Sequence, residues 1–279
     1  MILCMMPRNR NTLLTTFCFF SLICILICAG VFIASAMNGN ALPPPSAIRF
    51  PSFLSRIKLF QCNFPAIVLS CSALILFVPF STVLLSKFFG KNLPPEAVFF
   101  LGFLIGSLCE CARLVTIGLG LWQTFSDLLL IFGRITIFGR TLVPASFLFA
   151  AIMSESVQRQ TIARNFLILL SLSMIIAVVT PLNTSLITST ASIVPGFSNL
   201  FLVERIVFSI LAFVSFLYNA SARERIMYRS LAFAFLILIL GYAILLCADS
   251  IFFCIVGYAL FAVGIPKYLY IVHKLYVWG

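Results

Sequence analysis

Long apolar segments alternate with short polar ones along nearly the whole chain, from Leu13 to Tyr270. A bilayer core about 30 Å thick is crossed by a helix of roughly 20 apolar residues. Eight segments qualify, and each predicts a transmembrane helix. The predicted helices are Leu13–Met37, Pro65–Ser86, Ala97–Trp122, Asp127–Met153, Asn165–Leu182, Leu200–Ala220, Ser230–Ala248 and Ile251–Tyr270.

A β-barrel does not fit this pattern, because barrel strands alternate apolar and polar residues over about ten positions. The run Leu231–Leu240 shows no such alternation. The composition also excludes a soluble fold: 62% of the 279 residues are hydrophobic and 9% are charged, too few to cover a soluble core. We therefore predict an all-α fold, a polytopic membrane helical bundle that lies in a lipid bilayer.

The basic residues predict the orientation of the bundle. If the N-terminus is cytoplasmic, 11 of the 18 Lys and Arg residues lie in cytoplasmic segments, three lie in outer segments and four lie inside helices. This asymmetry follows the positive-inside rule and places the C-terminus in the cytoplasm. The basic residues are spread over short separate loops, so the net charge of +11 indicates topology, and we predict no nucleic-acid partner.

The first helix has two interpretations. Arg8 and Arg10 precede an apolar run, and Ala34-Ser35-Ala36 matches a signal-peptidase site, which would leave seven helices. The apolar run of about 20 residues is longer than a usual signal sequence and favours a retained anchor. The predicted organisation is an N-terminal signal or anchor (1–37), an outer linker (38–64) and a seven-helix membrane domain (65–279). Within the linker, Ile48–Phe60 suits either an interfacial helix or a loop on the bilayer.

Soluble-enzyme motifs are absent from the sequence. We find no phosphate-binding Gly-rich loop, no His-Glu-x-x-His and no Gly-x-Ser-x-Gly, and the ten cysteines show no zinc spacing. No catalytic residue, metal ligand or cofactor is therefore predicted, and an enzymatic activity is not favoured.

Charged residues inside the predicted helices carry most of the functional information, because a charge at the bilayer centre normally faces a partner or a wet cavity. Glu110 and Arg113 are three residues apart in the third helix, and Gly102 and Gly106 share their face, which predicts close helix packing there. The fourth helix carries Arg140. Counted from the short turn that joins these two helices, Glu110 and Arg140 lie at similar depth, so we predict an ion pair between them.

These charges define a candidate ligand-binding site with two interpretations. In one, a polar pocket among the third, fourth and sixth helices opens outward and binds an anion, such as a lipid headgroup or a small acid, because arginine suits carboxylate and phosphate. In the other, the charges form buried structural pairs, and the leftover arginines extend to the headgroups. The candidate residues are Glu110, Arg113, Arg134, Arg140, Glu204 and Arg205.

Several blocks resemble a group of uncharacterised spirochaete-type multi-pass inner-membrane proteins: Pro94–Glu96, Phe99–Leu101, Cys109–Leu114, Gly133–Arg140 and Tyr276–Trp278. The resemblance implies a bacterial inner membrane but no known activity and no functional residue. The seven helices after the first are also similar to the sensory membrane regions of bacterial seven-helix receptors. Such receptors usually continue into a kinase or cyclase domain, and this chain has none before Gly279.

Three functions are therefore considered. The first is a receptor-like module that binds an anionic ligand or lipid from the outer side and signals through a separate membrane or signalling protein. The second is a transporter or lipid-modifying enzyme, for which prolines such as Pro144 and Pro266 would supply discontinuous helices. The third is an accessory subunit whose embedded charges pair with other membrane chains.

Overall fold

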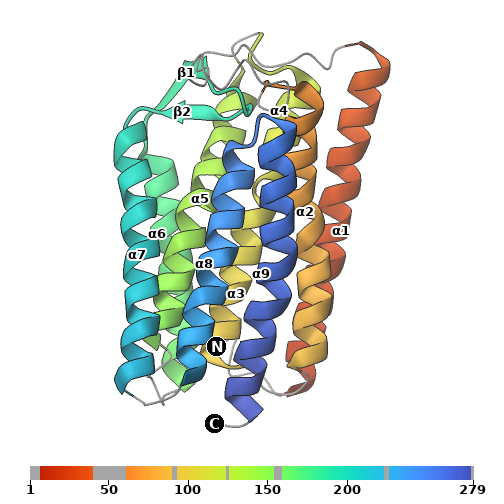
Figure 1. The fold of residues 1–279 in the computed structure, drawn as a ribbon. Helices are drawn as coiled ribbons and strands as arrows, with labels where there is room; N and C mark the ends of the chain where they lie inside the picture. The colour runs from red at the N-terminus through yellow and green to blue at the C-terminus, as the bar shows by residue number, and fades with distance from the viewer. Residues whose placement is uncertain are drawn as a thin grey trace.

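The apolar segments form long helices that run side by side in one bundle (Figure 1). The computed structural model describes residues 7–39, 61–89, 93–123, 126–153, 159–222 and 226–277. The helices are α1 (Pro7–Met37), α2 (Phe64–Phe88), α3 (Pro95–Leu108), α4 (Cys111–Leu119), α5 (Asp127–Met153), α6 (Arg159–Val179), α7 (Ser198–Ala222), α8 (Ile226–Cys247) and α9 (Ile251–Val277).

Within the described residues, eight helical segments are long and apolar enough to cross a membrane, with α3 and α4 counted as one. The predicted all-α polytopic bundle is therefore confirmed. Helix α1 packs against α2 and α4, and Ser35 of its small-residue motif donates a hydrogen bond to the Gly118 carbonyl. The predicted interfacial helix or loop at Ile48–Phe60 lies outside the described residues.

The predicted helix Ala97–Trp122 is interrupted at Cys109 and Glu110, where α3 ends and α4 begins. The chain tightens there: the Glu110 amide donates to the Ser107 carbonyl at 3.2 Å, and the Arg113 amide donates to the Glu110 carbonyl at 3.0 Å. These three-residue bonds are those of a 3₁₀ turn, which often marks a functional position inside a helix. Helix α4 then ends at Gly120, whose φ of 56° is the left-handed conformation that favours glycine.

Helices α3 and α5 approach closely at Gly106 and Gly139. A Cβ atom added to Gly106 would lie 2.7 Å from the Gly139 carbonyl oxygen, and one added to Gly139 would lie 2.6 Å from the Gly106 carbonyl oxygen. The predicted close packing at Gly106 is confirmed. This contact brings the two helices that carry Glu110 and Arg140 together.

A two-stranded antiparallel hairpin, β1 (Leu182–Ile187) and β2 (Ile193–Pro195), joins α6 to α7. The helix predicted to end at Leu182 instead ends at Val179, and the hairpin that follows it was not predicted. The hairpin lies over one end of the bundle, which we call the hairpin end (Figure 1), and its base is closed by the Gly196 amide, which donates to the Pro181 carbonyl at 2.8 Å. Two apolar hairpin side chains lie against Gly133 of α5, which secures the hairpin to the bundle.

The largest apolar core takes residues from every helix of the bundle, and aromatic rings of α3, α5, α8 and α9 pack together within it. Phe147 lies 4.9 Å from Phe235 between ring centroids, and Phe100 stacks on Tyr268 at 5.4 Å.

Candidate functional site

Three of the predicted site residues form one buried ion cluster. Arg113 Nη1 lies 3.1 Å from Glu110 Oε2, and Arg140 Nε lies 3.0 Å from Glu110 Oε1. The side chains of Glu110 and Arg113 are fully buried, and that of Arg140 is 17% exposed. The predicted ion pair between Glu110 and Arg140 is confirmed, and the 3₁₀ turn presents the carboxylate to both arginines.

The tip of the hairpin, Thr188–Ser192, covers this cluster. Arg113 Nε donates to the Thr190 carbonyl at 2.9 Å, and Arg140 Nη1 donates to Ser192 Oγ at 3.1 Å. Ala191 takes a left-handed φ of 57°, a conformation uncommon for a residue other than glycine. The hairpin tip thus supplies acceptors that the transmembrane helices do not.

The ion cluster fits the structural interpretation better than the ligand-binding one. Both Glu110 oxygens accept hydrogen bonds from arginine. The hairpin tip covers the two arginines on the side of the hairpin end. Within the described residues, Arg113 Nη2 is a buried atom without a hydrogen-bond partner. The other donors of the cluster are largely used within the protein.

Arg134 does not join the cluster, contrary to the prediction of one shared pocket. It is exposed on α5, and it precedes Arg140 by six residues, which turns it about 240° around the helix axis. In a membrane this position faces the surroundings of the bundle, where a long side chain extends toward the headgroups.

Glu204 and Arg205 are adjacent on α7 and therefore face different neighbours. Glu204 lines an apolar groove of about 640 Å³ between α6 and α7, and its two oxygens are buried without a partner among the described residues. Arg205 lines a second groove, between α7 and α8. Neighbouring residues of a helix are about 100° apart, and these two side chains line different grooves.

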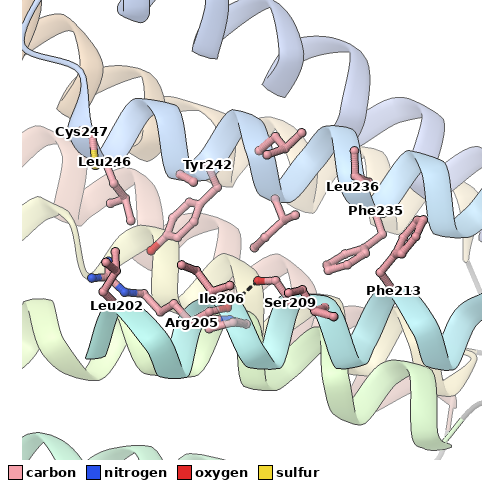
Figure 2. Close-up of a pocket in the computed structure, with 15 residues that line it drawn as sticks. Leu202, Arg205, Ile206, Ser209, Phe213, Phe235, Leu236, Tyr242, Leu246 and Cys247 are labelled. Carbon is pink, nitrogen blue, oxygen red and sulfur yellow. Dashed lines mark hydrogen bonds between the residues drawn. The ribbon is translucent and has the colours of Figure 1, made fainter. Parts of the chain in front are cut away.

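The α7–α8 groove has a volume of about 400 Å³ and a mostly apolar lining (Figure 2). Leu202, Ile206 and Phe213 line it from α7, and Phe235 and Leu246 line it from α8. Arg205 lies at the end nearer the hairpin, where the Tyr242 ring reaches from α8 toward α7 at the same level (Figure 2). The groove therefore combines a long apolar wall with a cationic end.

Two polar groups at this end are incompletely bonded within the described residues. Arg205 Nε donates to the Phe201 carbonyl at 3.0 Å. Neither of its Nη atoms has a hydrogen-bond partner among the described residues. Tyr242 is 2% exposed, and its hydroxyl is buried without a partner in the same part of the chain. The buried Tyr242 hydroxyl is costly to leave unpaired, and the half-buried Arg205 has free Nη donors, so this end of the groove has unused capacity to bind a ligand.

A smaller cavity of about 40 Å³ lies on the other side of Arg205, between α5, β2 and α7. Arg140 and Arg205 both line it. Arg205 is thus shared by the groove and the cavity, whereas Arg140 is shared by the cavity and the ion cluster.

Asp249, in the turn between α8 and α9, forms a separate polar contact with the hairpin. Its Oδ2 accepts a hydrogen bond from Ser189 Oγ at 3.2 Å, and its carbonyl accepts one from the Asn63 amide at 2.9 Å. Burial raises the pKa of the Asp249 carboxyl, and the Ser189 hydrogen bond partly opposes this. The turn ties the hairpin to the start of α2.

Sequence reasoning missed Tyr242 and the hairpin tip. Tyr242 lies within a long apolar helix, and nothing in the surrounding sequence indicates that polar residues of other helices lie near it. The tip has a visible signal, the hydroxyl-rich run Thr188-Ser189-Thr190-Ala191-Ser192, because such residues offer local hydrogen bonds that compete with regular helix.

No group of three His, Cys, Asp or Glu residues that would hold a metal ion occurs among the described residues. The cysteines in the same ranges are free thiols. The chain matches no protein-family model and no curated protein, and its resemblance to spirochaete-type membrane proteins stays a prediction.

Proposed function

We propose that this multi-pass membrane protein is a receptor-like module that binds an anionic lipid of the outer leaflet in the α7–α8 groove. One observation carries the proposal: an apolar groove of about 400 Å³ ends at Arg205 and Tyr242, which have unused hydrogen-bonding capacity. An acyl chain fits the apolar wall, and a phosphate or carboxylate fits the guanidinium.

The length of the groove supports a lipid ligand. Along α7 its lining runs from Leu202 to Phe213, and these 11 residue steps span about 16 Å of helix. The hydrocarbon core is about 30 Å thick, so the groove covers about one leaflet. A small acid without an acyl chain would leave most of the apolar wall unused.

The direction of the Arg205 side chain supports a headgroup near the membrane surface. Its Nε bonds to the Phe201 carbonyl, one helical turn closer to the hairpin end. The guanidinium therefore lies closer to that surface than its own Cα atom, as expected of an arginine that extends to the headgroups. A lipid phosphate could reach it while the acyl chain stays in the groove.

The charge asymmetry of the connections supports the orientation. The basic connections join the helices at the end opposite the hairpin, which the positive-inside rule places in the cytoplasm. The hairpin end then faces outward, the C-terminus is cytoplasmic, and the groove opens into the outer leaflet. In this proposal the protein lies in a bacterial inner membrane and passes the signal to a separate protein.

The test compares lipid binding by the wild-type protein, Arg205→Gln and Arg134→Gln. Arg134→Gln is a matched control, because it removes another arginine of a transmembrane helix that lies away from the groove. The purified proteins are titrated with phosphatidylglycerol and phosphatidylcholine, and bound lipid is counted by native mass spectrometry.

We expect Arg205→Gln to weaken phosphatidylglycerol binding roughly tenfold or more, the effect of losing a charge-assisted hydrogen bond. Arg134→Gln should bind as the wild type does, and phosphatidylcholine should bind less tightly than phosphatidylglycerol. Equal binding of both lipids by the wild type, or equal losses in the two variants, would refute the proposal.

A further inference from the structure

We infer that the small cavity between Arg140 and Arg205 binds a single inorganic anion of the size of chloride. The cavity is separate from the lipid groove and is not needed for the proposed lipid binding. It is lined by Thr136, Arg140 and Thr141 of α5, by Ile193 and Pro195 of β2, and by Arg205 of α7.

The size of the cavity restricts what it can hold. Its volume is about 40 Å³, and a single water needs roughly 10–15 Å³ measured in this way. A monatomic anion or a few waters therefore fit, whereas a lipid headgroup does not. The groove on the other side of Arg205 is much larger, at about 400 Å³, so the two spaces select different ligands.

The donors that face the cavity are guanidinium groups. Thr136 and Thr141 donate their hydroxyl protons to carbonyl oxygens of their own helix. Arg205 uses its Nε for the Phe201 carbonyl, and its four remaining N–H groups have no hydrogen-bond partner among the described residues. A guanidinium carries five donors and no acceptor, so these groups call for an acceptor, and an anion supplies one.

The charge balance favours an anion over water. The ion cluster and the cavity together contain three arginines: Arg113, Arg140 and Arg205. In the described part of the chain, Glu110 is the one carboxylate that forms an ion pair with any of them. Glu204 lines the α6–α7 groove instead. Uncompensated charge within a membrane is costly. An anion between Arg140 and Arg205 reduces the positive excess, whereas water does not.

The hairpin closes this site. Ile193 and Pro195 of β2 line the cavity, and Ser192, one residue before β2, accepts a hydrogen bond from Arg140. An anion held there would be shielded from the hairpin end and would secure β2 to α5 and α7. The expected readout is therefore stability as well as binding.

The experiment measures thermal unfolding of the purified full chain in detergent as sodium chloride replaces sodium gluconate at constant ionic strength. We expect chloride to raise the unfolding temperature progressively, reaching about 5 °C when chloride is far above its Kd, as linkage predicts for a chain of this length. Arg205→Gln should abolish the chloride response, whereas Arg134→Gln should keep it.

A crystal structure of the wild-type protein grown in sodium bromide gives a second readout that needs no variant to fold. We expect an anomalous bromide peak between Arg140 and Arg205. No peak there, an equal unfolding temperature in both salts, or a full chloride response in folded Arg205→Gln would each overturn the inference. Phosphatidylglycerol binding measured in gluconate separates the two proposals: if it persists without any chloride response, the anion site fails and the lipid site stands.

Discussion

Arg140 Nε lies 3.0 Å from Glu110 Oε1, so α5 is joined by an ion pair to the turn between α3 and α4 inside the bundle. The fully buried carboxylate is shared with Arg113. Removing one partner of a buried pair is costly because the remaining charge is left uncompensated. The loss of Glu110 should therefore be more severe than the loss of either arginine, because it leaves two guanidinium groups without an ion-pair partner.

We predict that Glu110→Gln lowers the free energy of unfolding by about 3–5 kcal/mol. Arg140→Gln should cost less, because Glu110 keeps its contact with Arg113. Equilibrium unfolding in mixed detergent micelles containing sodium dodecyl sulfate measures both variants. If Glu110→Gln unfolds at the same detergent composition as the wild type, the cluster is not structural.

The contact between α3 and α5 gives a second stability prediction. In Gly106→Ala the new Cβ atom would lie 2.7 Å from the Gly139 carbonyl oxygen, so the helices must move apart. We expect a loss of about 1–3 kcal/mol, the usual cost of overpacking. Gly30→Ala in α1 is the control, because a Cβ atom there meets nothing within 4 Å. Equal unfolding of the two variants would contradict the observed helix approach.

The sequence was sufficient to predict the helices and the central ion pair. Helices in lipid must satisfy their own backbone groups, so apolar length alone locates them. The depth of Glu110 and Arg140 followed from counting residues away from a short turn, because helices joined by a short turn run antiparallel with their ends level. Both predictions depend on helix length and on the geometry of a short turn, which can be inferred from a single sequence.

The failures concern rotation and non-local contacts. The depth of a residue in the membrane does not determine which face of its helix the side chain is on. Arg134, Glu204 and Arg205 were grouped by depth alone. The hairpin tip reaches the cluster from a connection about 50 residues beyond Arg140, and no local pattern records that contact. The 3₁₀ turn at Glu110 was also missed, because the flanking residues continue a helical apolar pattern on both sides.

Glu204 should respond to substitution in the opposite direction from Glu110. Its oxygens have no hydrogen-bond partner among the described residues, so a neutral side chain of similar shape lowers the desolvation cost and loses no hydrogen bond. We predict that Glu204→Gln raises the free energy of unfolding by on the order of 1 kcal/mol. The same detergent titration tests it, with Glu110→Gln alongside. A loss of stability would show that Glu204 has a partner in the membrane.

Cys62 tests the orientation of the bundle. It is exposed just before α2 at the hairpin end, which the charge pattern places outside. We expect a membrane-impermeant maleimide to label it on intact cells, and Cys62→Ser to remove that labelling. Labelling that requires inverted vesicles would reverse the orientation and with it the leaflet of the lipid groove.

The rate of that labelling also reports on Asp249. Although Cys62 is exposed, partial desolvation by its neighbours and the nearby Asp249 carboxylate raise the pKa of its thiol, and the thiolate is the reactive form. Labelling should therefore be faster at pH 8.5 than at pH 7 by more than for an ordinary exposed thiol. Asp249→Asn should speed it at pH 7, because the substitution removes the negative charge. An unchanged rate in this variant would show that the carboxylate does not act on the thiol.

Asp249 itself predicts a pH dependence of stability. Burial raises its carboxyl pKa above the ordinary value of 3.8, so the folded state binds this proton more tightly than the unfolded state does. Both states are protonated well below 3.8. As the pH rises through the raised pKa, the folded state must ionise a buried group, and its stability falls.

Asp249→Asn removes this dependence, because asparagine keeps an acceptor for Ser189 but does not ionise. Its unfolding temperature should exceed that of the wild type at pH 7.5, and the difference should shrink toward about pH 4. Ser189→Ala should steepen the pH dependence, because it removes the hydrogen bond that opposes the rise in pKa. Thermal unfolding of the three proteins at matched ionic strength measures this. If the difference in unfolding temperature between Asp249→Asn and the wild type grows as the pH falls, the predicted pH dependence is wrong. The folded state would then favour the ionised carboxylate.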